Sequence, residues 1–204
     1  TSLPIHDRGA PLRSLVHRWL SELGVRVVHA GAVATAAGAA LLVGGGGTGK
    51  STTSLACRES GLDFLGDDYV AIELEPMQVH SLYCSAKISW KHPAPVASGL
   101  TAVNRDRSDE KALFFLPDRA IAIAPIRAII APRVVVGSAS RLNPISAGQA
   151  LAAFAPSSVL QLPGDPGPTL ADLRTLCNQV PAFELLLGSD IEVVGELVEQ
   201  ALMS

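Results

Sequence analysis

Residues 40–52 read Ala-Leu-Leu-Val-Gly-Gly-Gly-Gly-Thr-Gly-Lys-Ser-Thr. The stretch contains the pattern G-x-x-x-x-G-K-[ST], with an apolar run before it and a helix-like segment, 51–60, after it. Such a glycine loop turns successive backbone N–H groups inward around phosphate oxygens, and the following helix adds the positive end of its dipole. The stretch therefore predicts a strand, a phosphate-binding loop and a helix, which together indicate an α/β fold.

This loop predicts a nucleotide site with ATP and Mg²⁺ as cofactors. Lys50 is expected to reach the β- and γ-phosphates, and Ser51 to offer its hydroxyl to the metal. The structural alternative is a glycine-rich turn that carries an exposed lysine. The residues expected to contact the nucleotide are Gly44, Gly45, Gly46, Gly47, Thr48, Gly49, Lys50, Ser51 and Thr52.

Composition narrows the classes of protein that the chain can belong to. It has 204 residues, of which 48% are hydrophobic and 17% charged, and its net charge is −3. These values exclude a disordered chain and argue against a nucleic-acid binder, whose affinity comes mainly from neutralising phosphates. The longest apolar run, 25–43, is interrupted by Arg26 and His29, so no membrane span is predicted. Asp7, Arg8 and Arg13 come before any apolar run, so we expect no signal peptide. The three cysteines form no CxxC pair, which favours a reduced, cytoplasmic protein without structural zinc.

The length of 204 residues predicts a single domain over 1–204, with an N-terminal helical segment (1–24) and a core (25–204). Residues 90–111 are predicted to be a loop or flap. The segments predicted to be helical are 12–23, 51–60, 146–160, 169–179 and 189–203. The segments predicted to be strands are 25–35, 39–43, 62–65, 69–74, 78–84, 112–116, 126–136 and 183–187.

Two of the predicted helices carry further signals. In the last one, Ser189 and Glu192 have the spacing of a capping box. In the first, apolar residues share one stripe, which is expected to face the core. That stripe consists of Leu12, Leu15, Val16, Trp19 and Leu23.

Two adjacent carboxylates, Asp67 and Asp68, follow the buried strand predicted over 62–65. Ligands of open α/β sheets bind at the carboxyl ends of strands, so we expect the pair to face the γ-phosphate. One carboxylate can then hold Mg²⁺ while the other takes a proton from an attacking hydroxyl. A polar turn between two strands is the structural alternative.

His29 lies in Val-Val-His-Ala-Gly, and Gly-Leu-Asp-Phe-Leu-Gly-Asp-Asp-Tyr-Val-Ala-Ile covers 61–72. Together with the glycine loop, these stretches resemble the catalytic domain of HPr kinase/phosphorylase over residues 25–74. The resemblance implies a mixed sheet with flanking helices, related to phosphoenolpyruvate carboxykinase. It also implies a homo-oligomer, because HPr kinases form hexamers.

The resemblance implies an ATP-dependent serine kinase and a role for each site residue. Asp67 would be the general base with His29 beside it, Lys50 would act on the phosphates, and Asp68 and Ser51 would hold the metal. The chain lacks the family's glycine-containing signature; the corresponding region, 84–91, reads Cys-Ser-Ala-Lys-Ile-Ser-Trp-Lys. This departure favours the short branch that includes lasso-peptide precursor kinases, with a peptide or small protein as the substrate.

Three further basic residues are candidate contacts to substrate or phosphate: Lys87, Lys111 and Arg133. For Lys87, a surface lysine that lays its stem over apolar neighbours is the structural alternative. Three other functions stay open at this point: a kinase of small molecules with the same site, a generic NTPase in which water replaces the acceptor, and a module that binds nucleotide without transferring phosphate.

Overall fold

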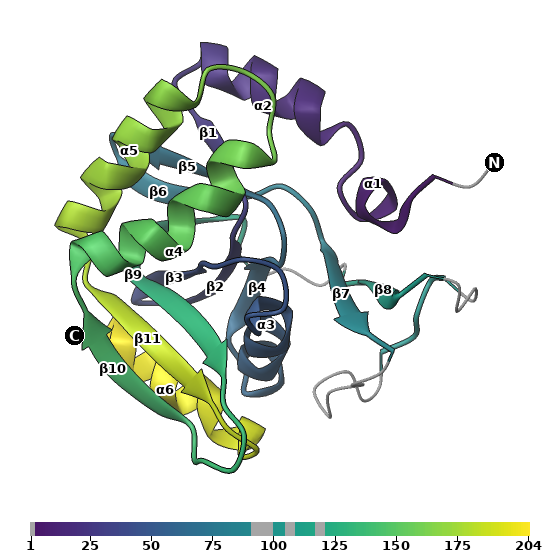
Figure 1. Ribbon diagram of the computed structural model, residues 1–204, viewed down its shortest axis with the longest axis vertical. Coiled ribbons are helices and arrows are strands. Elements are labelled where there is room, and N and C mark those ends of the chain that lie inside the picture. The colour runs from purple at the N-terminus through teal and green to yellow at the C-terminus, as the bar shows by residue number, and fades with distance from the viewer. Residues whose placement is uncertain (1–2, 91–99, 105–108, 117–120) are drawn as a thin grey trace.

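The computed structural model describes residues 3–90, 100–104, 109–116 and 121–204. Its centre is a nine-stranded mixed sheet with helices on both faces, so the predicted α/β fold class is confirmed (Figure 1). The helices are α1 (Ile5–Gly9), α2 (Arg13–Glu22), α3 (Lys50–Glu59), α4 (Ala147–Leu160), α5 (Pro166–Gln179), the short 3₁₀ helix η2 (Ile191–Val193) and α6 (Val194–Leu202).

The strands of the large sheet follow the order β1-β5-β6-β9-β3-β2-β4, and β11 joins it through β9 and carries β10 on its other side. A separate hairpin pairs β7 with β8. The strands are β1 (Arg26–Val28), β2 (Gly31–Thr35), β3 (Gly38–Leu42), β4 (Asp63–Gly66), β5 (Val70–Leu74), β6 (Met77–Ser81), β7 (Ser85–Ser89), β8 (Lys111–Phe115), β9 (Ile123–Val134), β10 (Arg141–Ile145) and β11 (Ala182–Leu187).

The long strand β9 holds the sheet together. Its first three residues pair antiparallel with β6, its middle pairs parallel with β3, and its last six residues pair parallel with β11. Parallel pairing brings the carboxyl ends of β3 and β9 to the same edge. The backbone N–H of Val43 still donates to the carbonyl of Ile130 there, which fixes where the glycine loop begins.

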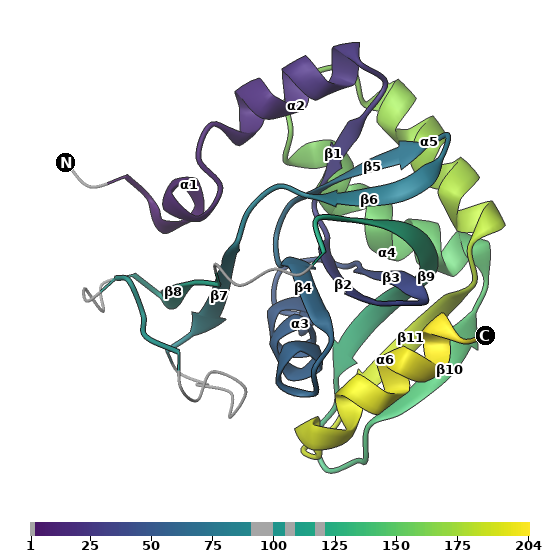
Figure 2. The same ribbon diagram turned by 180° about the vertical axis from the view of Figure 1, so that it is seen from behind.

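The two faces of the sheet bury alternating residues of the same strands. Along β3, Ala40 and Leu42 lie in the core that α3 and α6 cover, whereas Leu41 lies in the core that α4 and α5 cover. Figures 1 and 2 show these two helix pairs on opposite sides of the sheet. The alternation explains why the run before the glycine loop is apolar throughout: both of its faces are buried.

Most predicted elements are confirmed within a few residues, but the strand predicted over 25–35 is divided in two. The chain turns at His29 and Ala30, so that β1 pairs with β5 while β2 pairs with β3 and β4. Strands β7 and β10 were not predicted. In β10, Pro144 and the half-buried Asn143 hide the strand pattern, and the strand is held by its antiparallel pairing with β11.

The predicted capping box at Ser189 and Glu192 is wrong. Asp190 accepts hydrogen bonds at Oδ1 from both the N–H and the hydroxyl of Ser140, at 2.7 Å each. These bonds tie the turn after β11 to the loop before β10, and α6 begins only after η2. A capping box does form at α4, between Ser146 and Gln149.

The apolar stripe of the first predicted helix does not face the core as a whole. Val16 packs on a small cluster that includes Val27 and Tyr69, but the other four stripe residues are exposed. Within the described ranges, no helix is long and apolar enough to cross a membrane. Much of the predicted flap over 90–111, namely 91–99 and 105–108, lies outside the described residues.

Candidate functional site

The glycine loop between β3 and α3 has the backbone that its sequence predicts. Gly44, Gly47 and Gly49 have φ angles of +137°, +82° and +110°, a region that favours glycine. Lys50 opens α3, and its buried ammonium donates hydrogen bonds to the carbonyl oxygens of Gly44 and Gly45, at 2.7 and 3.0 Å. Burial lowers the pKa of Lys50, and the nearby aspartates oppose that shift.

Asp67 lies directly beside the first turn of α3. Its Oδ2 accepts hydrogen bonds from the hydroxyl of Ser51 at 2.9 Å and from the backbone N–H of Lys87 at 3.0 Å, and the hydroxyl of Ser54 lies 3.4 Å from Oδ1. The residue is only 1% exposed. Burial, followed by the charge of Asp68, raises the pKa of Asp67 to about 6. Asp67 is therefore turned toward the phosphate loop rather than toward solvent.

Asp68 faces a different set of groups. Its Oδ2 forms an ion pair with the ammonium of Lys87, and its Oδ1 lies 3.9 Å from Nε2 of His29. Burial alone would raise the pKa of Asp68, but the charge and hydrogen bond of Lys87 outweigh burial and lower it. The side chain keeps 22% of its surface exposed. The resemblance implies that His29 lies beside Asp67, and the structure brings the His29 ring within 3.9 Å of the carboxylate of the next residue, Asp68.

His29 is held in the turn between β1 and β2. Its backbone N–H donates to the hydroxyl of Ser158 at 3.1 Å, and its ring meets the ring of Tyr69 edge-on, with centroids 5.3 Å apart. Burial, and then the charge of Lys50, lowers the pKa of His29 to about 4. The imidazole is therefore neutral at neutral pH, and it can accept or donate one hydrogen bond without adding charge.

The three basic residues that were candidate contacts to substrate or phosphate lie in different environments. Lys87 is 8% exposed and enters the site, so it is not the surface lysine of the structural alternative. Lys111 opens β8, and its charge contributes to lowering the pKa of His29, Lys50 and Asp68. Arg133 is mostly exposed on β9 and pairs with Glu184 of β11 at 2.7 Å, so its contact lies away from the aspartates.

The N-terminal arm, which contains α1, packs on the hairpin of β7 and β8, and β7 carries Lys87. The hydroxyl of Ser85 donates to the carbonyl of Gly9 at 2.5 Å. A Cβ at Gly9 would lie 3.3 Å from Leu113 Cδ1 and 3.7 Å from Cδ of Lys87. The arm therefore helps to fix where the Lys87 ammonium lies, although the sequence resemblance begins only after it.

Several residues of the site could not be found by reading motifs. Tyr69 and Ser54 flank recognised motifs, yet nothing in their spacing marks them as partners of His29 and Asp67. Ser158 comes from α4, far along the chain. Their positions depend on which strands and helices meet.

A hydroxyl and a carboxylate at the start of α3 suit Mg²⁺, which binds few protein oxygens and keeps water and phosphate oxygens as its other ligands. Ser51 and Asp67 would hold it. In the part of the chain that the structure describes, no three His, Cys, Asp or Glu side chains converge as they would around a metal held by protein alone.

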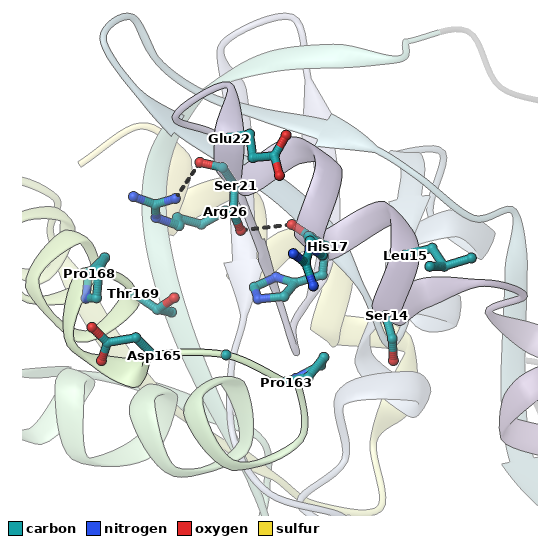
Figure 3. Close-up of a pocket in the computed structure, with 12 residues that line it drawn as sticks. Ser14, Leu15, His17, Ser21, Glu22, Arg26, Pro163, Asp165, Pro168 and Thr169 are labelled. Carbon is teal, nitrogen blue, oxygen red and sulfur yellow. Dashed lines mark hydrogen bonds between the residues drawn. The ribbon is translucent and has the colours of Figure 1, made fainter.

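A cleft of about 610 Å³ lies elsewhere, between α2 and the segment that leads into α5 (Figure 3). His17 lines it, directed toward the segment with Pro163 and Asp165. Burial is the main cause of the lowered pKa of His17. Neither Asp67 nor Asp68 lines this cleft.

No protein-family model matches the sequence, and no curated protein matches it either. Among solved structures, the chain is similar to one described as the Hpr(Ser) kinase/phosphatase from Coxiella burnetii. The two sequences are 14% identical, the match covers 87% of this chain and 94% of that one, and the TM-score is 0.40. A likeness of this size carries no inference about activity, and the function proposed below rests on this chain's own residues.

Proposed function

We propose that the chain is an ATP-dependent kinase that transfers the γ-phosphate to a hydroxyl group, namely a serine of a peptide or small protein. The observation that carries this proposal is the division of the two aspartates: Asp67 is bonded to Ser51 of the glycine loop, while Asp68 is paired with Lys87 and lies 3.9 Å from His29. The serine and peptide parts come from the sequence resemblance over residues 25–74.

Asp67 suits the role of a ligand to Mg²⁺. Its carboxylate is bonded to the hydroxyl that the motif offers to Mg²⁺, and its 1% exposure leaves little surface for an acceptor to touch. Bound Mg²⁺ would neutralise charge on the phosphate oxygens. Its approach would also favour the ionised form of Asp67.

Asp68 suits the role of general base. A base must lie within hydrogen-bond reach of the proton that it takes, and the Asp68 side chain keeps 22% of its surface exposed. Its carboxylate is ionised at neutral pH; because the lowered pKa makes it a weaker base, the assignment rests on its exposure and position. This exchanges the roles that the sequence suggested for Asp67 and Asp68. His29 would orient the Asp68 carboxylate, and Lys87 would balance charge beside it.

The proposed reaction is an in-line displacement. The acceptor oxygen forms a bond to the γ-phosphorus while the bond from that phosphorus to the β,γ-bridging oxygen breaks, and ADP leaves with the electron pair. The hydroxyl proton passes to a carboxylate oxygen of Asp68. Lys50, released from the carbonyls of Gly44 and Gly45, would donate to phosphate oxygens.

The test compares Asp67→Asn and Asp68→Asn in two assays. One measures MgATP affinity by calorimetry. The other incubates each protein with γ-labelled ATP and a panel of serine peptides, HPr and small hydroxylated metabolites, and locates the label by mass spectrometry. Asp68→Asn is expected to keep the wild-type affinity and to lose transfer by about a hundredfold or more. Asp67→Asn is expected to weaken MgATP binding.

Each other outcome has a defined meaning. If Asp67→Asn abolishes transfer at unchanged MgATP affinity while Asp68→Asn stays active, Asp67 is the base. Label on metabolites alone makes the chain a small-molecule kinase. Nucleotide binding without transfer to any acceptor in the panel would overturn the proposal in favour of a nucleotide-binding module.

A further inference from the structure

One face of α2 exposes an unusual amount of apolar surface. Four large apolar side chains are each between 62% and 70% exposed. Leu15 and Trp19, four residues apart, lie on one side of the helix, and Leu12 and Leu23 flank them at its two caps. We name this set the α2 ridge; it consists of Leu12, Leu15, Trp19 and Leu23.

The ridge is not a by-product of core packing. The core side of α2 is formed by Val16, His17 and Leu20, which border the ridge on one flank. Single exposed apolar residues are normal, but a contiguous apolar stripe marks a surface that another chain covers. Full burial of each such side chain contributes about 1.5–3 kcal/mol, so the stripe favours association.

Charge on the flank of the ridge indicates which chain covers it. Arg18 and Glu22 are exposed, lie one turn apart on the same flank, and carry opposite charges. Neither has an ion pair or a side-chain hydrogen bond within the described residues. The other flank of the ridge carries Val16. This flank therefore carries the positive charge of Arg18 before Trp19 and the negative charge of Glu22 after it.

We propose that the α2 ridge packs antiparallel against the α2 ridge of a second copy of this chain, across a two-fold axis near Trp19. In antiparallel helix pairs the same flank of both helices meets, so Arg18 would face Glu22 of the partner subunit, and the reverse. Leu15 would pack against Leu23 of the partner subunit. A parallel pair would instead bring this charged flank against the flank that carries Val16.

The position of α2 suits this interface. Figures 1 and 2 show α2 at the periphery of the molecule, away from α3 and the glycine loop. Val16 of α2 packs on the cluster that contains Tyr69, but none of the four ridge residues belongs to the candidate site. Leu15, Arg18 and Glu22 also line the cleft of Figure 3, so the second helix would lie along one wall of that cleft. The interface is independent of the proposed kinase activity.

The interface is small. Four apolar side chains with one charged flank bury less than the roughly 800 Å² per partner of a standard interface. We therefore expect a dissociation constant on the order of 10 µM rather than a permanent dimer.

A charge-exchange series tests the proposal by sedimentation velocity between 1 and 300 µM protein. Arg18→Glu and Glu22→Arg each place like charges together twice across the two-fold axis, and each should weaken the dimer about tenfold. The double variant exchanges the charges and should restore the affinity to within about threefold. Trp19→Gln should weaken it more than either single reversal, because Trp19 lies at the axis.

Arg174→Glu, on the exposed side of α5, is the matched control and should leave the dissociation constant unchanged. Each variant is expected to fold because the substituted residue is exposed, and circular dichroism checks this. A wild-type protein that stays monomeric at 300 µM would overturn the proposal. So would a dimer that ignores all of these changes. Single reversals that weaken the dimer without recovery in the double variant would overturn the antiparallel arrangement.

Discussion

The hydroxyl of Ser51 donates a hydrogen bond of 2.9 Å to Oδ2 of Asp67, and this bond joins the first turn of α3 to the turn after β4. It couples the glycine loop to a carboxylate that is almost completely buried. The raised pKa of Asp67 follows from this burial and from the adjacent charge of Asp68.

Asp67→Asn is expected to stabilise the nucleotide-free protein at pH 8. The pKa of Asp67 is about 6 in the folded protein, against 3.8 for an ordinary aspartate, so the folded state holds this proton more tightly than the unfolded chain does. The ionised carboxylate therefore destabilises the folded state, by an amount that grows from pH 4 and is complete above pH 6. Removing it should raise the free energy of unfolding by about 1–3 kcal/mol at pH 8 and by almost nothing at pH 4.

Urea unfolding of wild type and variant at both pH values measures this effect. Asp68→Asn is the matched contrast, because the pKa of Asp68 is lowered in the folded protein. Its ionised form stabilises the fold above the unfolded pKa, and that stability is lost as the pH falls through the folded pKa. Asp68→Asn should therefore destabilise the protein at pH 8. Equal effects of both substitutions would contradict the environments assigned to the two carboxylates.

Gly49→Ala is expected to destabilise the fold and to abolish nucleotide binding, whereas Gly46→Ala should leave the fold intact. A Cβ at Gly49 would lie 2.3 Å from Leu187 Cδ1, at a φ of +110°. The strain and the clash together should cost about 2 kcal/mol or more. A Cβ at Gly46 has no neighbour within 4 Å in the described structure. Thermal unfolding with and without MgATP separates the two; similar melting temperatures would show that the loop tolerates a side chain at position 49.

Ser85→Ala is expected to alter activity through Lys87, as a positioning residue. The substitution removes the hydrogen bond to the carbonyl of Gly9 and should lower the free energy of unfolding by about 1 kcal/mol. A looser hairpin holds Lys87 less firmly beside Asp68. The pKa of Asp68 should then rise, which would move the acid limb of the kcat profile to higher pH.

The measurement is the pH dependence of kcat for wild type and Ser85→Ala. Ser21→Ala is the control, because it also removes a side-chain hydrogen bond to a carbonyl, that of His17, but lies in α2. Its pH profile should match that of the wild type. If Ser85→Ala loses stability but keeps the wild-type profile, the hydrogen bond is structural only.

The errors of prediction in this chain have definable physical causes. Helical spacing showed that Leu15 and Trp19 share a stripe, but spacing cannot distinguish a face that meets the core from one that meets another surface. Ser189 and Glu192 have the residue types and spacing of a capping box. Asp190, however, is hydrogen-bonded to Ser140, and this tertiary contact overrides the local cap.

By itself the sequence determined the local structure of the phosphate loop. The glycines, Lys50 and Ser51 lie within eight consecutive residues, so their arrangement depends on local backbone geometry. The apolar run before them is explained by a strand buried on both faces. It also determined the α/β class and the nearness of Asp67 and Asp68 to that loop. Only the tertiary structure decided that Asp67 faces Ser51 while Asp68 faces Lys87 and His29. Adjacent residues point to different sides, and the groups that they meet come from segments whose contact depends on strand pairing, which no local pattern encodes.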